Sequence, residues 1–259
     1  MTEILLTATE LAIAGLAAFA AGVVNALAGG GTLISFPALV ALGIPEISAN
    51  ITNTVALCPG YLGGAVAQRD DLGGQGRRLW IFLPIAAAGG IIGAMLLLFV
   101  DPRVFRFLIP FLILAASVLL AVQNRLKAWI RSRSTGVPSD KTAIGNAMVP
   151  VGLSTVYGGY FGAGQSVLIL AVLGLFIEDS LQRLNALKQG ISLASNIAAA
   201  IFFLFSGMVV WEAAAVMVVG AFAGGAAGGR FATRINAELL RWSVVSIGLA
   251  IGIWFLVTW

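Results

Sequence analysis

Residues 24–33 of the chain read VNALAGGGTL and residues 157–166 read YGGYFGAGQS, and these two stretches decide the fold. Each is a glycine-rich break inside an apolar segment of about 30 residues that carries almost no charge. Glycine allows backbone conformations that other residues avoid, so the chain can change direction at each break. Paired, interrupted hydrophobic segments in matching halves are typical of the substrate site of secondary transporters. The two breaks therefore predict a membrane transport protein.

The composition supports a membrane protein and excludes several kinds of site. Hydrophobic residues make up 59% of the 259 residues and charged residues only 10%, whereas soluble domains carry about 25% charged residues. The sequence has no histidine and one cysteine, Cys58. This composition leaves no residues for a disulfide, haem, an iron–sulfur cluster or most transition-metal sites. We therefore expect no cofactor, no bound metal and no nucleic-acid partner, and we interpret Cys58 as a small packing residue.

Charged residues, glycines and prolines divide the chain into apolar segments close to the roughly 20 residues that cross a bilayer as a helix. They predict an all-α polytopic membrane protein with two inverted repeats, each a re-entrant helical hairpin plus three transmembrane helices. The first repeat, 1–123, has its hairpin at 11–43 and its spans at 47–67, 79–99 and 104–123. A basic cytoplasmic linker, 124–142, leads to the second repeat, 143–259, with its hairpin at 143–177 and its spans at 183–205, 211–229 and 239–258.

The two repeats align at an offset of 135 residues, which reduces to 133 at the glycine breaks. Asn50 then falls on Asn185 and Asn53 on Lys188. If each broken segment crossed the membrane once, the repeats would be parallel and several arginines of the second half would lie outside. If each segment dips in and returns, the second repeat is inverted and most cations lie inside. The cytoplasmic enrichment of Lys and Arg favours the inverted arrangement, with both termini outside.

The breaks themselves form the first candidate site. A new helix begins at Thr32 and another at Gln165, and the first amides of a helix lack partners within it and attract anions. A turn at membrane depth is tolerated only against other protein or a water-filled cavity. The alternative is that the glycines only allow close helix packing. We predict that the residues around the two tips bind substrate: Asn25, Gly30, Gly31, Thr32, Tyr157, Gly164, Gln165 and Ser166.

The span after each break carries a second matched set of polar residues. Lys188 is the only basic residue well inside a predicted span, and an intramembrane cation is costly and usually functional. The alternative is that its flexible stem reaches the headgroups. An inward-facing Lys188 would supply a positive charge to an anion, and residues one helical turn apart would line the same face. The remaining candidates on these spans are Asn50, Asn53, Asn185 and Ser192.

At these residues the chain resembles the TauE/SafE family of sulfite and organosulfonate exporters of bacterial membranes. The resemblance rests on Asn25-x-x-x-Gly29-Gly30-Gly31-Thr32-Leu33-x-x-x-Pro37, on Ile44-Pro45-x-x-x-Ala49-Asn50-x-Thr52-Asn53, on Gly159-x-x-Gly162-x-Gly164, and on Arg183-Leu184-Asn185-Ala186-Leu187-Lys188. It covers nearly the whole chain and implies export of a small anion across the bacterial cytoplasmic (inner) membrane by inverted repeats whose hairpins cradle the substrate. The sequence departs from the family pattern at Asn53 and Leu187, where serine and threonine would be expected.

The leading hypothesis is a secondary carrier, not an enzyme, that exports sulfite or an organosulfonate such as sulfoacetate by alternating access. A passive small-anion channel and a permease for another small anion, such as a carboxylate, stay open as alternatives. An intramembrane enzyme would need a nucleophile and base or a metal, and a structural scaffold would need no ligand at all. Small residues four apart within spans indicate helix packing inside the chain, with a homodimer as the alternative.

Overall fold

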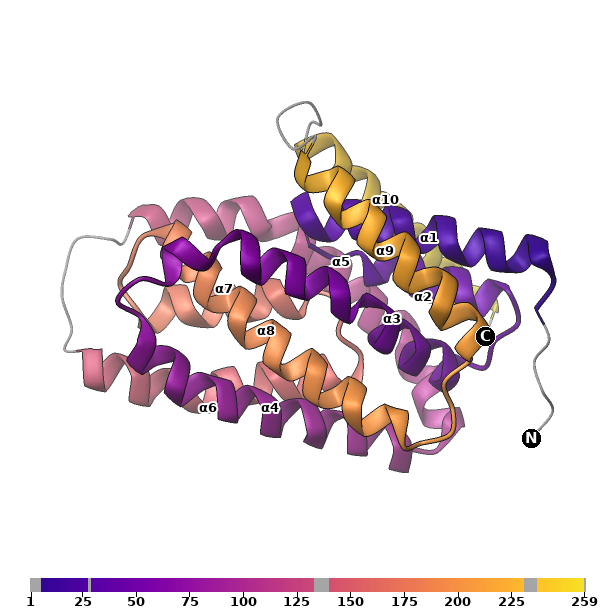
Figure 1. Cartoon of the computed structure of the whole chain (residues 1–259), viewed down its shortest axis with the longest axis horizontal. Coiled ribbons are helices and arrows are strands. Elements are labelled where there is room, and N and C mark those ends of the chain that lie inside the picture. Colours follow the sequence, from indigo (N-terminus) through magenta and orange to yellow (C-terminus); the bar gives the residue numbers. More distant parts are fainter. Residues whose placement is uncertain (1–5, 28, 133–139, 231–236, 259) are drawn as a thin grey trace.

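The computed structural model describes residues 6–27, 29–132, 140–230 and 237–258, and the secondary structure of these residues is entirely helical. Figure 1 shows an elongated bundle in which most helices run roughly along the long axis. The first half contains α1 (Ala8–Leu27), α2 (Thr32–Ala41), α3 (Glu46–Ala67), the short 3-10 helix η1 (Arg69–Leu72), α4 (Gly76–Phe99) and α5 (Pro102–Ser132). The second half contains α6 (Asp140–Tyr160), α7 (Gln165–Phe176), α8 (Leu181–Leu204), α9 (Trp211–Arg230) and α10 (Ala237–Thr258).

The two broken segments are helical hairpins, as the glycine breaks predict. In each, a long helix is followed after a few residues by a shorter one that packs against it, α1 with α2 and α6 with α7. The turns need glycine, because Gly29, Gly30, Gly162 and Gly164 all have φ between +76° and +90°. Other residues rarely adopt this left-handed region.

The main departure from the predicted elements is α5, which continues for nine residues beyond the predicted span end at residue 123 and reaches Ser132. The charged residues between 124 and 132 predict a linker. The same stretch, however, contains good helix formers and no glycine or proline. Ile130 is buried in this extension and packs over Gly174 of α7. Tertiary packing thus holds the extension as helix; residues 133–139 of the predicted linker lie outside the described residues.

Six described helices are long and apolar enough to cross a bilayer: α1, α4, α5, α8, α9 and α10. The number matches the six predicted spans, but one of the six helices is not the one predicted. The set includes α1 and omits α3, which was predicted as the span 47–67. The reason is the polar run at the start of α3, Asn50, Thr52, Asn53 and Thr54, which lowers its hydropathy and is buried inside the protein.

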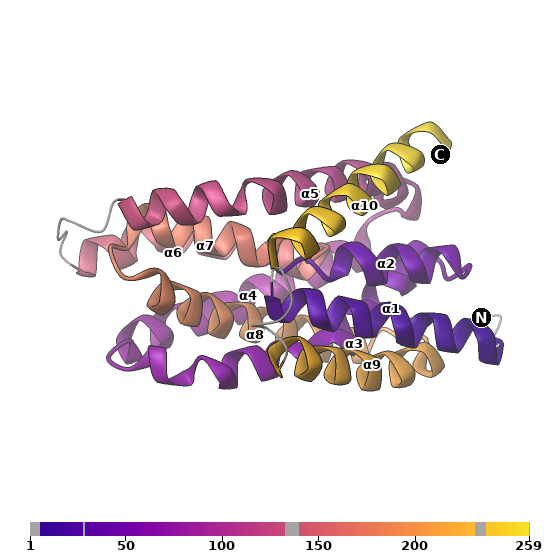
Figure 2. The same ribbon diagram turned by 90° about the horizontal axis from the view of Figure 1, so that it is seen from above.

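The contacts between helices repeat from one half to the other. The first helix of each half packs on the fourth helix of the other, α1 on α9 and α6 on α4. In the same way α3 packs on α9 and α8 on α4, while α5 contacts α10 and α3 contacts α8. Figures 1 and 2 place the α1–α2 hairpin toward one end of the long axis and the α6–α7 hairpin toward the other. An inverted duplication predicts this arrangement; its orientation across a bilayer stays a prediction.

Small residues bring these helices into backbone contact. A side chain at Gly224 would meet the Phe19 carbonyl of α1, and one at Gly93 would meet the Val156 carbonyl of α6. The two glycines occupy equivalent interfaces in the two halves. Small residues let helices approach closely where the bilayer supplies no hydrophobic driving force. The glycine spacing in α4 and α9 therefore serves packing within the chain.

An ion-pair network joins the two halves at the end of the bundle that the sequence predicts to be cytoplasmic. Asp179, in the connection between α7 and α8, pairs with Arg78 of α4 and with Arg183 of α8, the latter at 2.9 Å. Arg183 also donates to the Gly73 carbonyl at 2.7 Å. Burial by itself raises the pKa of the Asp179 carboxyl, but hydrogen bonds from the two arginines outweigh it, so the pKa lies below the ordinary value.

Candidate functional site

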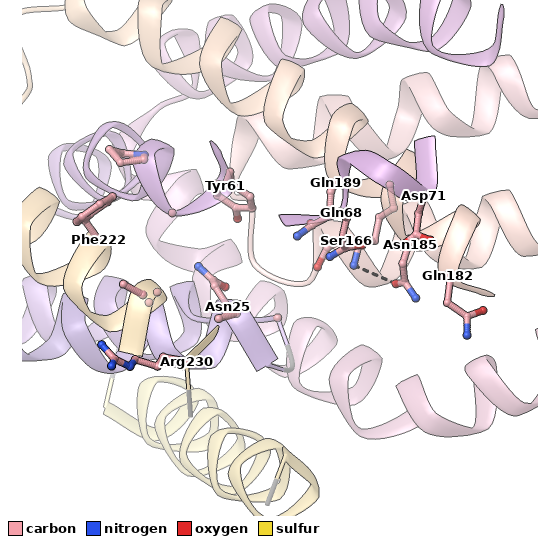
Figure 3. A pocket seen from close by; sticks show the side chains of 18 of the residues that line it. Asn25, Tyr61, Gln68, Asp71, Ser166, Gln182, Asn185, Gln189, Phe222 and Arg230 are labelled. Carbon is pink, nitrogen blue, oxygen red and sulfur yellow. Dashed lines mark hydrogen bonds between the residues drawn. The ribbon is translucent and has the colours of Figure 1, made fainter. Parts of the chain in front are cut away.

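A cavity of about 690 Å³ opens between the halves and reaches the tips of both hairpins. Asn25 and Gly29 line it from the first tip and Ser166 from the second, while Asn185, Lys188 and Gln189 line it from α8. Figure 3 shows Asn25, Ser166, Asn185 and Gln189 around this space. Its other walls include Gln68 and Asp71 near η1, Lys127 of α5 and Arg230 of α9. These last residues lie in segments that the sequence predicts to be cytoplasmic, so the cavity extends from that face to the tips.

The cavity carries more positive than negative charge. Its positively charged lining residues are Lys127, Lys188 and Arg230, and its negatively charged one is Asp71, which gives three cations against one anion. The Lys127 ammonium lies close enough to Lys188 to act on it electrostatically. Like charges in a partly enclosed space favour a bound anion between them, because the low-dielectric walls strengthen each interaction. The cavity is therefore suited to a small anion.

The polar side chains of α8 are held in place by their own helix. Lys188 Nζ donates to Asn185 Oδ1 at 3.3 Å, and Asn185 Nδ2 donates to the Leu181 carbonyl at 2.9 Å. Asn185 thus faces the cavity with its oxygen toward the ammonium. The Lys188 side chain keeps two further N–H donors for a ligand. This arrangement fixes one cationic donor group at the cavity wall.

The two hairpin tips adjoin. A Cβ atom added to Gly29 would lie 3.1 Å from Ser166 Oγ, so the first tip comes within van der Waals distance of the start of α7. Tyr157 braces the second tip by donating from its hydroxyl to the Ala163 carbonyl at 2.7 Å. Asn25 braces the first, because its Oδ1 accepts from the Gly31 amide at 2.8 Å. The duplicated breaks thus meet at one place in the molecule.

Most helix-start amides at the tips are already paired in this conformation. The amides of Leu33 and Ile34 donate to carbonyls of the first break, at 2.9 Å each. Those of Gln165, Val167 and Leu168 donate to carbonyls of the second break at 3.0–3.2 Å. The structure therefore supports binding of an anion by side chains more than the predicted binding by amide dipoles. What the cavity offers an anion is mainly the ammonium, amide and hydroxyl groups of its lining.

The predicted site residues divide into two groups. Four of the thirteen line the cavity: Asn25, Ser166, Asn185 and Lys188. The other nine are not among its lining residues, and all of them except Tyr157 are buried: Gly30, Gly31, Thr32, Asn50, Asn53, Tyr157, Gly164, Gln165 and Ser192. The structure thus brings the tips and α8 together around one space, whereas the predicted residues of α3 are covered by protein.

The buried group includes polar atoms without a hydrogen-bond partner. Among the described residues these include Asn50 Oδ1, Asn53 Oδ1, Gln165 Nε2 and Ser192 Oγ. The Gln165 side chain makes one hydrogen bond, accepting from Asn196 Nδ2 at 3.1 Å. A buried polar atom without a partner costs about 1–3 kcal/mol. All four atoms belong to residues that the sequence predicts to be part of the site.

Sequence reasoning missed several cavity residues. Lys127 lies in the helical extension of α5 that the sequence predicts to be a linker, and Arg230 is one of the second-half arginines that indicate only the orientation in the membrane. Gln123, four residues earlier and so on the same helix face, lines the cavity together with Lys127, but only the fold brings this face to the cavity. The contribution of Asp71 depends on the folding of η1 against α8, which no local pattern reveals.

The chain is similar to several membrane proteins along most of its length. It is 28% identical to the probable membrane transporter protein ORF9 of Sinorhizobium sp., over 94% of this chain and 91% of that protein. It is also 28% identical to the probable membrane transporter protein YfcA of Escherichia coli K12, over 89% and 83% of the two chains, and to a probable membrane transporter protein of Haemophilus influenzae, over 91% and 90%. No solved structure matches it.

These similarities agree with the six apolar helices, and the protein is a multi-pass membrane transporter. The family model described as sulfite exporter TauE/SafE matches residues 14–255, which is nearly the whole chain and includes both glycine breaks. The chain belongs to the TauE/SafE family.

Proposed function

We propose that this transporter exports a small sulfur-containing anion, sulfite or an organosulfonate such as sulfoacetate, across the bacterial inner membrane by alternating access. The observation that carries the proposal is the cavity, with three cations against one anion, that ends at both hairpin tips. The family name supports a sulfur oxyanion as the substrate. In the orientation predicted from the cations, the cavity opens to the cytoplasm and receives substrate from there.

The groups in the cavity suit a sulfonate or sulfite. Such an anion presents three oxygens that accept hydrogen bonds and carry the charge. Lys188 supplies charge-assisted hydrogen bonds, which are roughly twice as strong as neutral ones. Asn25 and Ser166 provide neutral donors from the two tips. Because the tips belong to different halves of the chain, an anion held between them contacts both, and relative movement of the halves can expose it to the other side.

The membrane potential is sufficient to drive export. An inside-negative potential favours exit of one negative charge by about 2.3 kcal/mol per 100 mV, which corresponds to a roughly fiftyfold concentration ratio. The carboxylate of the cavity, Asp71, lies in η1 near the helix ends rather than deep in a span. The proposed transport therefore needs no proton relay through intramembrane acids, and it is electrogenic.

The test is flux in proteoliposomes that contain the purified protein. Vesicles are loaded with radiolabelled sulfite or sulfoacetate, and a potassium gradient with valinomycin sets the potential. The expected result is saturable flux that increases with the potential and that Lys188→Gln reduces. Lys141→Gln is the matched control, because it removes an exposed cation of α6 outside the cavity. Flux that ignores the potential, or that follows a pH gradient alone, would contradict electrogenic export.

A further inference from the structure

Four aromatic side chains pack around the second tip and the start of α5, toward the opposite end of α5 from the cavity residues Gln123 and Lys127. Phe161, at the end of the α6–α7 hairpin, packs edge-on against Phe36 of α2 at 5.3 Å between ring centroids and also meets Phe105 of α5 at 6.5 Å. Tyr160 contacts Phe105 at 5.6 Å, again nearly perpendicular. Phe36, Phe105 and Phe161 are at most 2% exposed. We call these four residues the aromatic cluster.

Hydrogen bonds and an ion pair also join the helices in this region. Asn50 of α3 donates from Nδ2 to the Tyr160 carbonyl at 2.9 Å, so α3 holds the second tip by its backbone. Further out, Glu46 pairs with Arg106 at 2.8 Å and joins the starts of α3 and α5. The Val210 amide, ahead of α9, donates to Thr52 Oγ1 at 3.0 Å. Each of these bonds joins segments far apart in the sequence.

The described counterparts of these rings in the other half are not aromatic. At the offsets of the duplication, Phe36 corresponds to Ile169 and Phe105 to Leu240, which are both aliphatic. Asn185, the counterpart of Asn50, donates to a carbonyl of its own helix and faces the cavity. Aromatic rings and an interhelical hydrogen bond therefore pack one side of the tips, whereas the cavity reaches the tips from the other side.

We propose that the aromatic cluster and the Asn50–Tyr160 hydrogen bond form the gate that separates the cavity from the far side of the membrane. The gate opens when the second hairpin moves away from α2, α3 and α5, which breaks the bond to the Tyr160 carbonyl and separates Phe161 from Phe36 and Phe105. This inference rests on the proposed alternating-access transport, but the closed gate is a property of the structure that can be measured without a substrate.

The test places a single reactive cysteine in the cavity. Cys58, the one natural cysteine, is replaced by alanine, and Ser166→Cys supplies a thiol at the second tip. A membrane-impermeant maleimide is added to intact cells or to inside-out vesicles. With the gate intact, the thiol reacts only from the side on which the cavity opens, which the sequence predicts to be the cytoplasm.

Two variants weaken the gate by different means. Phe161→Ala removes the ring contacts with Phe36 and Phe105, and Asn50→Ala removes the hydrogen bond to the tip without altering a ring. Each should raise the labelling rate from the closed side about tenfold, the factor that corresponds to 1.4 kcal/mol. Phe82→Ala is the control: Phe82 of α4 is equally buried but packs in a separate hydrophobic cluster, to which α5, α6, α7 and α8 also contribute.

Three results would overturn the gate. They are equal labelling from both sides before any gate variant, no change in either gate variant, and an equal increase in Phe82→Ala. If Phe161→Ala does not yield a monodisperse protein, Asn50→Ala decides alone. Failure of sulfite or sulfoacetate flux would refute the proposed substrate and leave the labelling pattern unaffected, so the two proposals fail separately.

Discussion

Lys188 allows the sharpest test of the anion site. The change is Lys188→Gln, which keeps most of the side chain's length and its ability to donate a hydrogen bond but removes the positive charge. Of the three cations that line the cavity, Lys188 lies on the same helix as Asn185 and directly beside it. Its loss reduces the balance of lining charges from three against one to two against one.

The expected effect follows from the surroundings of the ammonium. An anion about 4 Å away gains about 1 kcal/mol in water and about 4 kcal/mol at the effective dielectric constant near a protein surface. The cavity opens to solvent, so the value lies between these limits, and hydrogen bonds to charged groups contribute about 1.5–3 kcal/mol in proteins. We expect a loss of about 2 kcal/mol, or roughly a thirtyfold weaker Kd.

Isothermal titration calorimetry of detergent-purified protein with sulfite, sulfoacetate and taurine measures this directly. Lys188→Arg keeps the charge and should bind within a few-fold of the parent protein, while Lys141→Gln should bind as the parent does. Lys127→Gln should weaken binding less than Lys188→Gln, because Lys127 lies on α5 near the cavity mouth. Equal affinity of Lys188→Gln and the parent protein for every anion that binds would refute the assignment of this site.

Two further predictions concern stability. Asp179→Asn breaks the pairs with Arg78 and Arg183 and should lower the Tm in detergent by about 3–8 °C, which corresponds to about 1–3 kcal/mol for a partly buried pair. Because the folded-state pKa of the Asp179 carboxyl is lowered, the stabilisation is present above the unfolded pKa and is lost as the pH falls through the folded pKa. The difference in Tm between the parent protein and the variant should therefore shrink in acid, and a constant difference would contradict the ion pairs. Gly164→Ala places a side chain at φ +76° and should destabilise the protein by about 1–3 kcal/mol, whereas Gly145→Ala, with open space around a helical position, should leave the Tm unchanged or raise it; equal thermal unfolding of the two variants would contradict the strained turn.

The helices could be predicted well because their punctuation is local. Glycine, proline and charged residues mark nearly every helix end, and the predicted span 211–229 differs from α9 by one residue. The meeting of the two tips could also be predicted, since the duplication implies equivalent positions for both breaks. The same local signals failed for α5, where charge suggests a linker but packing of Ile130 on α7 maintains the helix.

The lining of the cavity could be predicted only in part. Lys188 and Asn185 stand out because polar residues inside an apolar span are rare and costly. Lys127 and Asp71 join them only through contacts between segments remote in the sequence, which no local pattern encodes. The sequence predicts Asn25 as a residue of the first tip, but its pairing with the Gly31 amide depends on the detailed path of the turn.

The exchange of contacts between halves has a consequence for how the chain can be divided. The first helix of each repeat lies, with glycine at the contact, against the fourth helix of the other repeat, α1 on α9 and α6 on α4. The helix that packs against the first helix of each repeat belongs to the other repeat. A fragment ending after α5 would therefore expose to lipid the surface of α1 that α9 covers. The smallest unit that folds on its own is thus the two repeats together. Two separately translated fragments would have to be inserted into the same membrane and associate there to recover the protein.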